Sequence, residues 1–248
     1  MTVTNGIGDA GWRLFECESA VSTNDLARDF GAWSAVRAET QSGGRGRFGR
    51  AFISDPGGLW ISAVLPTEGG PAKWAGFSLR VGVALVQMLE ALDTPFARLR
   101  WPNDLMCGSK KLGGLLIEQF SPDRLIVGFG LNVSNAPWEA EPALEPFATS
   151  LARVLTDVPS VPQMAVRTLD ALAEAHAEMV TGGMDSAINE LNERWRDPIP
   201  VRIDLSDGTS VTGQFVGLDP LGNLRLRDAP EREFLVPHQR VERLAEIL

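Results

Sequence analysis

Cysteine and positive charge are both scarce in this sequence. Cys17 and Cys107 are its only cysteines, too few for a disulfide framework, so we expect a protein of the reducing cytoplasm. The 23 lysines and arginines are outnumbered by 32 aspartates and glutamates, which gives a net charge of −9. An acidic chain is poorly suited to extended binding of a polyanion, so we expect no nucleic-acid partner.

Long apolar runs are also missing. No stretch approaches the ~20 consecutive apolar residues that a helix needs to span a bilayer, so we expect no membrane partner. Residues 1–10, MTVTNGIGDA, have neither the basic start nor the apolar core of a signal peptide.

Few side chains are suited to nucleophilic or metal chemistry. His176 falls within an expected helix and has no second His or Cys at metal-ligand spacing, so we interpret it as a solvated helical residue. No plausible Ser-His-Asp or Cys-His set is present, and we therefore expect chemistry that needs no nucleophilic side chain.

Against this background, residues 43–50 stand out, because the run GGRGRFGR concentrates three arginines and four glycines in eight residues. Glycine lets the backbone lie against a ligand at an entropic cost. The guanidinium groups of Arg45, Arg47 and Arg50 are suited to bidentate contact with phosphate or carboxylate oxygens. The run predicts an anion-binding loop that becomes ordered around its ligand.

Other interpretations of this loop fit less well. Gly44, Gly46 and Gly49 satisfy the dinucleotide pattern G-x-G-x-x-G, but that pattern requires a helix directly afterwards. A turn at residues 56–58 and an apolar, β-prone run follow instead. A phosphate-binding P-loop is excluded because no Gly-Lys-Ser/Thr follows the glycines. A kinase is excluded because Asp29-Phe30-Gly31 precedes the glycine-rich loop, whereas the DFG motif of kinases follows it. An RGG-type RNA contact stays open as a non-enzymatic alternative, although the net charge disfavours it.

The hydrophobic pattern predicts an alternation of strands and helices followed by a small β-barrel. Ser22 to Asp25 is typical of a helix start, with one of the polar side chains expected to cap it. Arg196 to Pro200 marks the expected domain boundary, beyond which short alternating segments predict strands. Before it, we expect strands at 12–17, 34–39, 60–65, 96–101, 111–119 and 125–133, and helices at 71–92, 144–155, 162–180 and 184–195.

Residues 43–50 are called the arginine loop below. Several residues outside it are candidates for ligand contacts. The amide of Gln41, just before the loop, can donate and accept hydrogen bonds at once. Asn103 and Asp104 lie in a turn from which side chains can point at a ligand. Lys111 stands close to Gly113 and Gly114, where a strand without side chains leaves room for another group.

These segments resemble, in order and spacing, the biotin protein ligases. The resemblance rests on Ser22-Thr23-Asn24, the arginine loop, residues 101–105 (WPNDL), residues 110–114 (KKLGG) and residues 128–132 (GFGLN). It covers a catalytic domain from about Trp12 to Trp195, and the last 50 residues resemble the family's SH3-like C-terminal domain.

The resemblance implies an α+β fold, in which a mixed β-sheet of the class II synthetase-like biotin/lipoate ligase type is packed by helices. It implies domains of residues 1–196 and 197–248, the latter a small SH3-like β-barrel. The implied reaction joins biotin to ATP, with Mg²⁺, as biotinyl-5′-AMP. The biotinyl group then passes to one lysine of a biotin carboxyl carrier domain of acetyl-CoA carboxylase or a related carboxylase. A homodimer is compatible with the resemblance.

Residue roles follow from the same resemblance. Lys111, Arg47 and Arg45 are implied as the catalytic cations, and Asp104 as a Mg²⁺ ligand or as the base that keeps the incoming lysine neutral. The implied biotin contacts are Ser22, Thr23, Asn24, Gln41, Gly44, Arg45, Gly46, Arg47, Lys111 and Gly114. The implied ATP and adenylate contacts are Arg47, Arg50, Phe52, Asn103, Lys111, Gly128 and Asn132.

The sequence also departs from the family pattern. Phe52 stands where the family often has a tryptophan that packs on adenine, and Phe48 replaces a frequent basic residue; we expect activity to survive both changes. The DNA-binding domain of the repressor-type members is not expected, because only eleven residues precede the first strand. A lipoate or octanoate ligase or transferase of the related fold remains the alternative, although we interpret Cys107 as incidental to any thioester chemistry.

Overall fold

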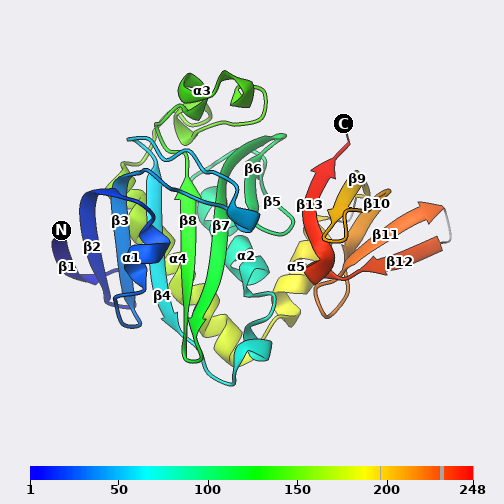
Figure 1. Cartoon of the computed structure of the whole chain (residues 1–248), viewed down its shortest axis with the longest axis horizontal. Coiled ribbons are helices and arrows are strands. Elements are labelled where there is room, and N and C mark those ends of the chain that lie inside the picture. Colours follow the sequence, from blue (N-terminus) through cyan, green and yellow to red (C-terminus); the bar gives the residue numbers. More distant parts are fainter. Residues whose placement is uncertain (196, 230–231, 248) are drawn as a thin grey trace. The chain divides into compact units, whose positions relative to one another are not determined.

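The computed structural model describes residues 1–195, 197–229 and 232–247, so Arg196, at the expected domain boundary, lies outside the described residues. The chain forms two compact units, Met1–Val180 and Thr181–Leu248 (Figure 1). In the part that the structure describes, no helix combines the length and the apolar character needed to cross a membrane.

The first unit is built on an eight-stranded sheet in the order β1-β2-β3-β4-β8-β7-β6-β5. Strands β2 and β3 pair in parallel, whereas the other neighbours are antiparallel. The predicted mixed sheet is therefore confirmed. The strands are β1 (Thr2–Ile7), β2 (Trp12–Ala20), β3 (Ser34–Gln41), β4 (Leu59–Pro66), β5 (Ala97–Arg100), β6 (Asp104–Cys107), β7 (Lys110–Ser121) and β8 (Arg124–Leu131).

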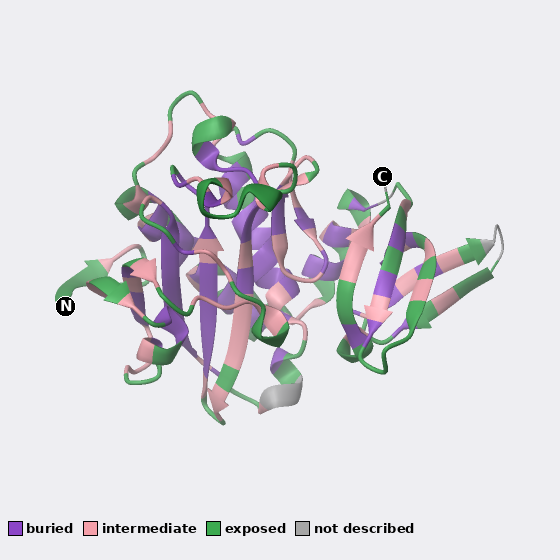
Figure 2. Ribbon diagram, turned by 45° about the horizontal axis from the view of Figure 1, so that its top comes forward, coloured by how far each residue is buried: buried purple, intermediate pink, exposed green. Residues whose placement is uncertain are grey.

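The central strands carry most of the core. In β4 every residue but the last is buried, and β8 is buried over most of its length. Such continuous apolar strands form where both faces of a sheet are covered. Figure 2 shows the buried residues concentrated along these strands.

Helices cover both faces of the sheet. In the view of Figure 1, α2 (Phe77–Glu90) and α4 (Val161–Gly182) lie behind it, whereas the short α1 (Thr23–Ala27) lies in front. The helix expected over 71–92 is interrupted. A 3₁₀ turn, Pro71–Trp74, precedes α2, and between them Gly76 has a φ of 80°, which favours glycine and ends the helical path.

Other expectations need correction. The chain start forms the edge strand β1, and the turn after Pro102 leads directly into β6. The helical segment expected over 144–155 is replaced by three short pieces, α3 (Pro137–Ala140), η3 (Pro142–Leu144) and η4 (Leu151–Arg153). These segments are only three or four residues long, too short to show helical periodicity.

His176 is buried and not solvated as expected, with only 8% of its surface exposed. Its ring stacks on Trp74 at a centroid distance of 5.1 Å and meets the edge of Trp33 at 5.2 Å. Its Nε2 donates a hydrogen bond to the carbonyl of Pro66 at 2.9 Å. Burial lowers the pKa of His176, outweighing this hydrogen bond, so the neutral ring is favoured.

The second unit combines α5 (Asp185–Arg194) with a small antiparallel sheet in the order β12-β11-β10-β9-β13. The side chain of Asn192 joins the helix to the sheet, accepting from the backbone N–H of Leu218 at 2.7 Å and donating to its carbonyl at 3.1 Å. The four strands predicted here are present, and β13 is additional. The strands are β9 (Ile199–Leu205), β10 (Ser210–Leu218), β11 (Leu224–Ala229), β12 (Arg232–Val236) and β13 (Val241–Glu246).

Candidate active site

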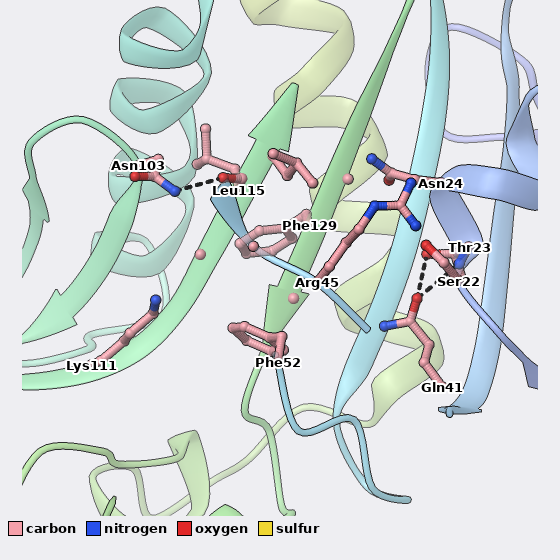
Figure 3. A pocket seen from close by; sticks show the side chains of 15 residues that line it. Ser22, Thr23, Asn24, Gln41, Arg45, Phe52, Asn103, Lys111, Leu115 and Phe129 are labelled. Carbon is pink, nitrogen blue, oxygen red and sulfur yellow. Dashed lines mark hydrogen bonds between the residues drawn. The ribbon is translucent and has the colours of Figure 1, made fainter. Parts of the chain in front are cut away.

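A pocket opens on the first unit, on the side of the sheet that carries α1 (Figure 3). It is a cleft whose free space of about 480 Å³ includes open solvent at its mouth. Its walls come from α1, the arginine loop and strands β3, β7 and β8. The lining residues are Ser22, Thr23, Asn24, Gln41, Arg45, Gly46, Phe52, Asn103, Lys111, Gly114, Leu115, Leu116, Gly128, Phe129 and Gly130.

The structure therefore brings most of the sequence-predicted site residues together around one cavity. The pocket lining does not include Gly44, Arg47, Arg50, Asp104 or Asn132. Conversely, Leu115, Leu116, Phe129 and Gly130 line the pocket without having been singled out as contacts. Their signal was the glycine-rich pattern of two adjacent strands, which leaves one face of the sheet without bulky side chains.

One end of the pocket is a network of hydroxyl and amide groups. Gln41 Oε1 accepts from the backbone N–H of Thr23 at 2.8 Å and from its hydroxyl at 3.0 Å, while Gln41 Nε2 donates to Ser54 at 2.9 Å. Gln41, at the end of β3, thus accepts a hydrogen bond from the first backbone N–H group of α1. The Ser22 side chain makes no capping bond, so the predicted local cap is replaced by this long-range one.

Asn24 continues this network toward the sheet. The hydroxyl of Ser62 lies 2.7 Å from Thr23 Oγ1 and 2.6 Å from Asn24 Oδ1, so its single proton can be donated to either. Asn24 Nδ2 donates to Glu118 at 2.7 Å. A Cβ on Gly128 would lie 2.1 Å from Asn24 Oδ1, so the close approach of Asn24 requires glycine at that position.

The arginine loop forms a narrow hairpin between Gln41 and Ser54. The backbone N–H of Phe52 donates to Gly44 at 2.9 Å, and that of Gly46 donates to Arg50 at 2.8 Å. At its tip, Phe48 has a φ of 58° and is exposed. The loop therefore has backbone hydrogen bonds of its own, and ordering by a ligand stays a prediction.

Arg45 turns from this loop toward α1. Its Nη1 and Nη2 atoms donate to the two carboxylate oxygens of Asp25, each at 2.7 Å, and Nη2 lies 3.4 Å from Glu118. The hydrogen bond with Arg45 lowers the pKa of Asp25, so this pair is fully charged at neutral pH. Two carboxylates thus neutralise a guanidinium that the sequence assigned to the substrate.

Arg47, two residues farther along the loop, lies near two aromatic rings. Its guanidinium carbon is 5.0 Å from the Phe48 ring centroid and 6.0 Å from that of Trp101. Burial lowers the pKa of Arg47, and the nearby charge of Arg50 acts in the same direction. An arginine remains protonated under such conditions, so its charge is held in a partly desolvated place where it can act strongly on an anion.

Lys111 contributes an ammonium group to the pocket lining. Its Nζ lies 2.6 Å from Asp104 Oδ1, while Arg100 donates to Asp104 Oδ2 at 2.7 Å. Burial raises the pKa of Asp104, but the charges and hydrogen bonds of Lys111 and Arg100 outweigh it and leave the pKa below its usual range. Asp104 is therefore an ionised carboxylate between two cations.

This arrangement does not fit the predicted role of Asp104 as a Mg²⁺ ligand. Both carboxylate oxygens are already paired with positive groups, and a divalent cation would meet two like charges there. No group of three or more His, Cys, Asp or Glu side chains suited to a metal occurs among the described residues. Mg²⁺ as the counter-ion of ATP stays a prediction.

Phe52 lies between the polar end and Lys111. Its ring meets Trp60 edge-on at 5.7 Å, and Lys111 Nζ is 5.6 Å from its centroid. A Cβ on Gly130 would come within 2.8 Å of this ring, so the aromatic side chain lies against bare backbone. Its position is suited to a flat ligand group, as predicted for adenine.

Two asparagines of the predicted nucleotide site have structural partners. Asn103 Nδ2 donates to the carbonyl of Leu115 at 2.8 Å, which fixes the turn before β6 against β7. Asn132 is buried, donating to Thr149 at 3.0 Å and accepting from Asn135 at 3.0 Å. Asn103 still lines the pocket, whereas Asn132 supports the wall behind it.

Comparison with known proteins agrees with this geometry. The model of the Biotin/lipoate A/B protein ligase family matches residues 22–132. A biotin--[acetyl-CoA-carboxylase] ligase of Paracoccus denitrificans is 30% identical over 82% of this chain and 87% of that protein. The biotin protein ligase from Aquifex aeolicus, solved in complex with biotin and ATP, superposes with a TM-score of 0.80 at 25% identity, covering 94% of this chain and 99% of that chain.

The match to the bifunctional ligase/repressor BirA of Bacillus subtilis is shorter, at 36% identity over 48% of this chain and 38% of that protein. The chain thus spans less than half the length of that relative. From the fold, the pocket and these similarities, the chain belongs to the Biotin/lipoate A/B protein ligase family. Within that family it groups with the biotin protein ligases.

Proposed function

We propose that this protein activates biotin with ATP to biotinyl-5′-AMP and transfers the biotinyl group to a lysine of a biotin carboxyl carrier domain. The observation that carries the proposal is that one pocket joins a hydroxyl and amide network at Thr23 and Gln41 to an ammonium group at Lys111. Such a pocket can hold a polar ring at one end and an activated carboxylate at the other. The similar Aquifex protein was solved with both biotin and ATP.

The polar end suits the cyclic urea of biotin. A urea offers two N–H donors and a carbonyl acceptor, and Ser22, Thr23, Asn24 and Gln41 present hydroxyl and amide groups that can meet both. The apolar side chains of Leu115 and Phe129 line the pocket farther along. We assign the aliphatic part of biotin to this stretch, with its carboxylate directed toward Lys111.

In the first step, a carboxylate oxygen of biotin attacks the α-phosphorus of ATP. A new P–O bond forms, the bond to the β-phosphate oxygen breaks, and pyrophosphate leaves. Because two anions must approach each other, the site has to supply positive charge at the shared oxygens. We assign this role to Lys111, which lines the pocket, and to Arg47 of the loop, with Lys111 exchanging its contact with Asp104 for one with the incoming phosphate.

In the second step, the neutral amine of the carrier lysine attacks the carbonyl carbon of the adenylate. A C–N bond forms, the C–O bond to the phosphate breaks, AMP leaves and the proton lost by the amine passes to solvent water. The lowered pKa of Asp104 makes it a weak proton acceptor. We therefore assign Asp104 to holding Lys111 in place and not to deprotonating the amine.

The remaining site assignments complete the proposal. We assign Phe52, Lys111 and Asn103, which line the pocket, to the adenylate. Gly128, predicted as an adenylate contact, lies against Asn24 at the polar end, and Gly44, Arg50 and Asn132 are not among the lining residues. We place the reaction in the cytoplasm, where the free thiols of Cys17 and Cys107 would stay reduced. The homodimer, the SH3-like character of the second unit and the domain division at residues 196 and 197 stay predictions.

Calorimetry with biotin and with lipoate tests the choice of acid. We expect heat of binding with biotin and none with lipoate at equal concentration. Addition of ATP, Mg²⁺ and a carrier domain should then release pyrophosphate and increase the mass of the carrier by one biotinyl group. Binding of lipoate in preference to biotin would favour the lipoate ligase alternative, and no pyrophosphate release with either acid would contradict the proposal.

A further inference from the structure

Arg45, which lines the pocket, connects the arginine loop to two carboxylates. Its guanidinium makes a bidentate ion pair with Asp25 of α1, with both distances at 2.7 Å, and approaches Glu118 of β7 at 3.4 Å. The Arg45 side chain is only 27% exposed. In Figure 3 it extends from the loop toward Asn24 and away from Lys111. Asp25, Arg45 and Glu118 are called the Arg45 network below.

The charge balance of the Arg45 network disfavours a substrate anion at this guanidinium. The Arg45 guanidinium lies between two carboxylates, and Arg28 Nη2 lies 3.8 Å from one of them, Glu118, so these four charges balance and leave no net positive charge for a ligand. A phosphate or carboxylate of the ligand would have to displace Asp25 from both of its hydrogen bonds and would meet the repulsion of Glu118. Arg45 is therefore engaged in holding the loop.

Glu118 links the Arg45 network to Asn24, a residue that lines the polar end of the pocket. It accepts from Asn24 Nδ2 at 2.7 Å, which fixes the orientation of that amide and leaves Asn24 Oδ1 to accept from Ser62 at 2.6 Å. The same carboxylate thus contacts a side chain of the polar end and a side chain of the loop. Glu118 therefore connects the polar end of the pocket to the arginine loop.

We propose that Asp25, supported by Glu118, is a positioning residue that keeps the arginine loop closed over the pocket through Arg45. In this role Arg45 retains the acyl adenylate until the carrier lysine arrives and does not neutralise the phosphate. Arg47, whose guanidinium carbon lies 6.0 Å from the Trp101 ring centroid, keeps the electrostatic role. The inference rests on the proposed function, since it concerns retention of that reaction's intermediate.

The first test measures escape of preformed biotinyl-5′-AMP after excess unlabelled biotin is added. Asp25→Asn should release it on the order of 5-fold faster than the natural protein, a reasonable effect for losing one partly exposed bidentate pair. Asp25→Glu should restore slow release, and Arg45→Lys, which keeps the charge but loses the fork, should resemble Asp25→Asn. Asp29→Asn, an exposed aspartate four residues further along, is the matched control and should release at the natural rate.

Comparing the rate of adenylate release with the rate of adenylate formation distinguishes a role in retention from a role in chemistry. The increase in the release rate for Asp25→Asn should exceed any decrease in the rate of pyrophosphate release during adenylate formation. If Asp25→Asn or Arg45→Lys slowed adenylate formation while release stayed slow, Arg45 would be a chemical cation and the proposal would be overturned. Natural release rates in both variants would overturn it as well.

A second measurement does not depend on activity. Trypsin cleaves after arginine, and the loop carries three of them, so the rate of cleavage within residues 45–50 reports loop opening in the absence of ligand. Asp25→Asn should be cleaved severalfold faster than the natural protein, and Asp29→Asn at the natural rate. If the protein made no adenylate but Asp25→Asn opened the loop, the proposed function would fail while the anchoring role held; equal cleavage of all three proteins would reject the anchoring role.

Discussion

The Nζ atom of Lys111 lies 2.6 Å from Oδ1 of Asp104, and the second carboxylate oxygen is taken by Arg100 at 2.7 Å. The ammonium group that we propose as a ligand contact is thus already paired with a carboxylate. Since the pKa of Asp104 lies below its usual range, that carboxylate stays ionised at neutral pH. An incoming anion therefore enters a site whose charge is organised beforehand and exchanges one partner of Lys111 for another.

Replacing Lys111 by alanine should impair adenylate formation. Loss of one preorganised cation at the reacting oxygens is expected to reduce the first-step rate by about 10²- to 10³-fold. Single-turnover release of pyrophosphate measures this rate. Lys110→Ala is the matched control, because the neighbouring Lys110 donates to the backbone carbonyl of Glu145 and does not line the pocket. A natural rate in Lys111→Ala would remove Lys111 from the mechanism.

Replacing Arg47 by glycine should let the adenylate leave before transfer. The change removes a partly desolvated charge near Trp101 and adds backbone freedom to the loop. Free adenylate acylates exposed lysines, so mass spectrometry should find biotin on many lysines of an added bystander protein. Arg47→Lys keeps the charge and should label fewer. Labelling confined to the carrier in Arg47→Gly would contradict this role of the loop.

Replacing Gly128 by alanine should weaken biotin binding. The new Cβ would lie 2.1 Å from Asn24 Oδ1, so Asn24 must move away from Ser62 or Glu118. We expect a stability loss of about 1–3 kcal/mol, as is common for overpacking a buried site, together with a higher dissociation constant for biotin in calorimetry. The control is Gly31→Ala, whose Cβ would meet no atom closer than 3.9 Å. Unchanged biotin affinity in Gly128→Ala would show that Asn24 has no part in binding.

His176 should make stability depend on pH. Because burial lowers its pKa in the folded protein, the unfolded chain binds a proton there more readily, with an ordinary pKa of about 6.5. The contribution of the neutral ring is full above that pH and is lost as the pH falls through it toward the folded-state pKa. Urea unfolding at neutral and at mildly acidic pH should show this loss, and His176→Phe should show less of it. An equal pH dependence in both proteins would assign the effect to other groups.

Strong apolar patterns made much of the fold predictable. The continuous runs of β4 and β8 and the periodic spacing of α4 identify their elements because burial dictates those residues. The four-residue β6 was missed because it forms by pairing with β7 and has no pattern of its own. Burial of His176 was missed for a similar reason, since its stacking partner Trp74 lies about a hundred residues earlier.

The site, like the fold, was predictable in part. The motif residues could be assigned to a pocket because their order matches a known family. The direction of the Arg45 side chain could not be predicted from the sequence, because it depends on where α1 places Asp25 and where β7 places Glu118. The available signals were weak: Asp25 directly follows Ser22-Thr23-Asn24, and Glu118 is a charged residue in a largely apolar strand.

Every residue of the pocket lining lies between Ser22 and Gly130, within the first unit, and none of the described lining residues comes from β9 to β13. Ligand choice is therefore encoded by one continuous segment of less than half the chain. A chimera that kept this segment and exchanged the residues after Thr181 for those of a relative should keep its preference for the small acid, so any altered behaviour could be traced to the exchanged part.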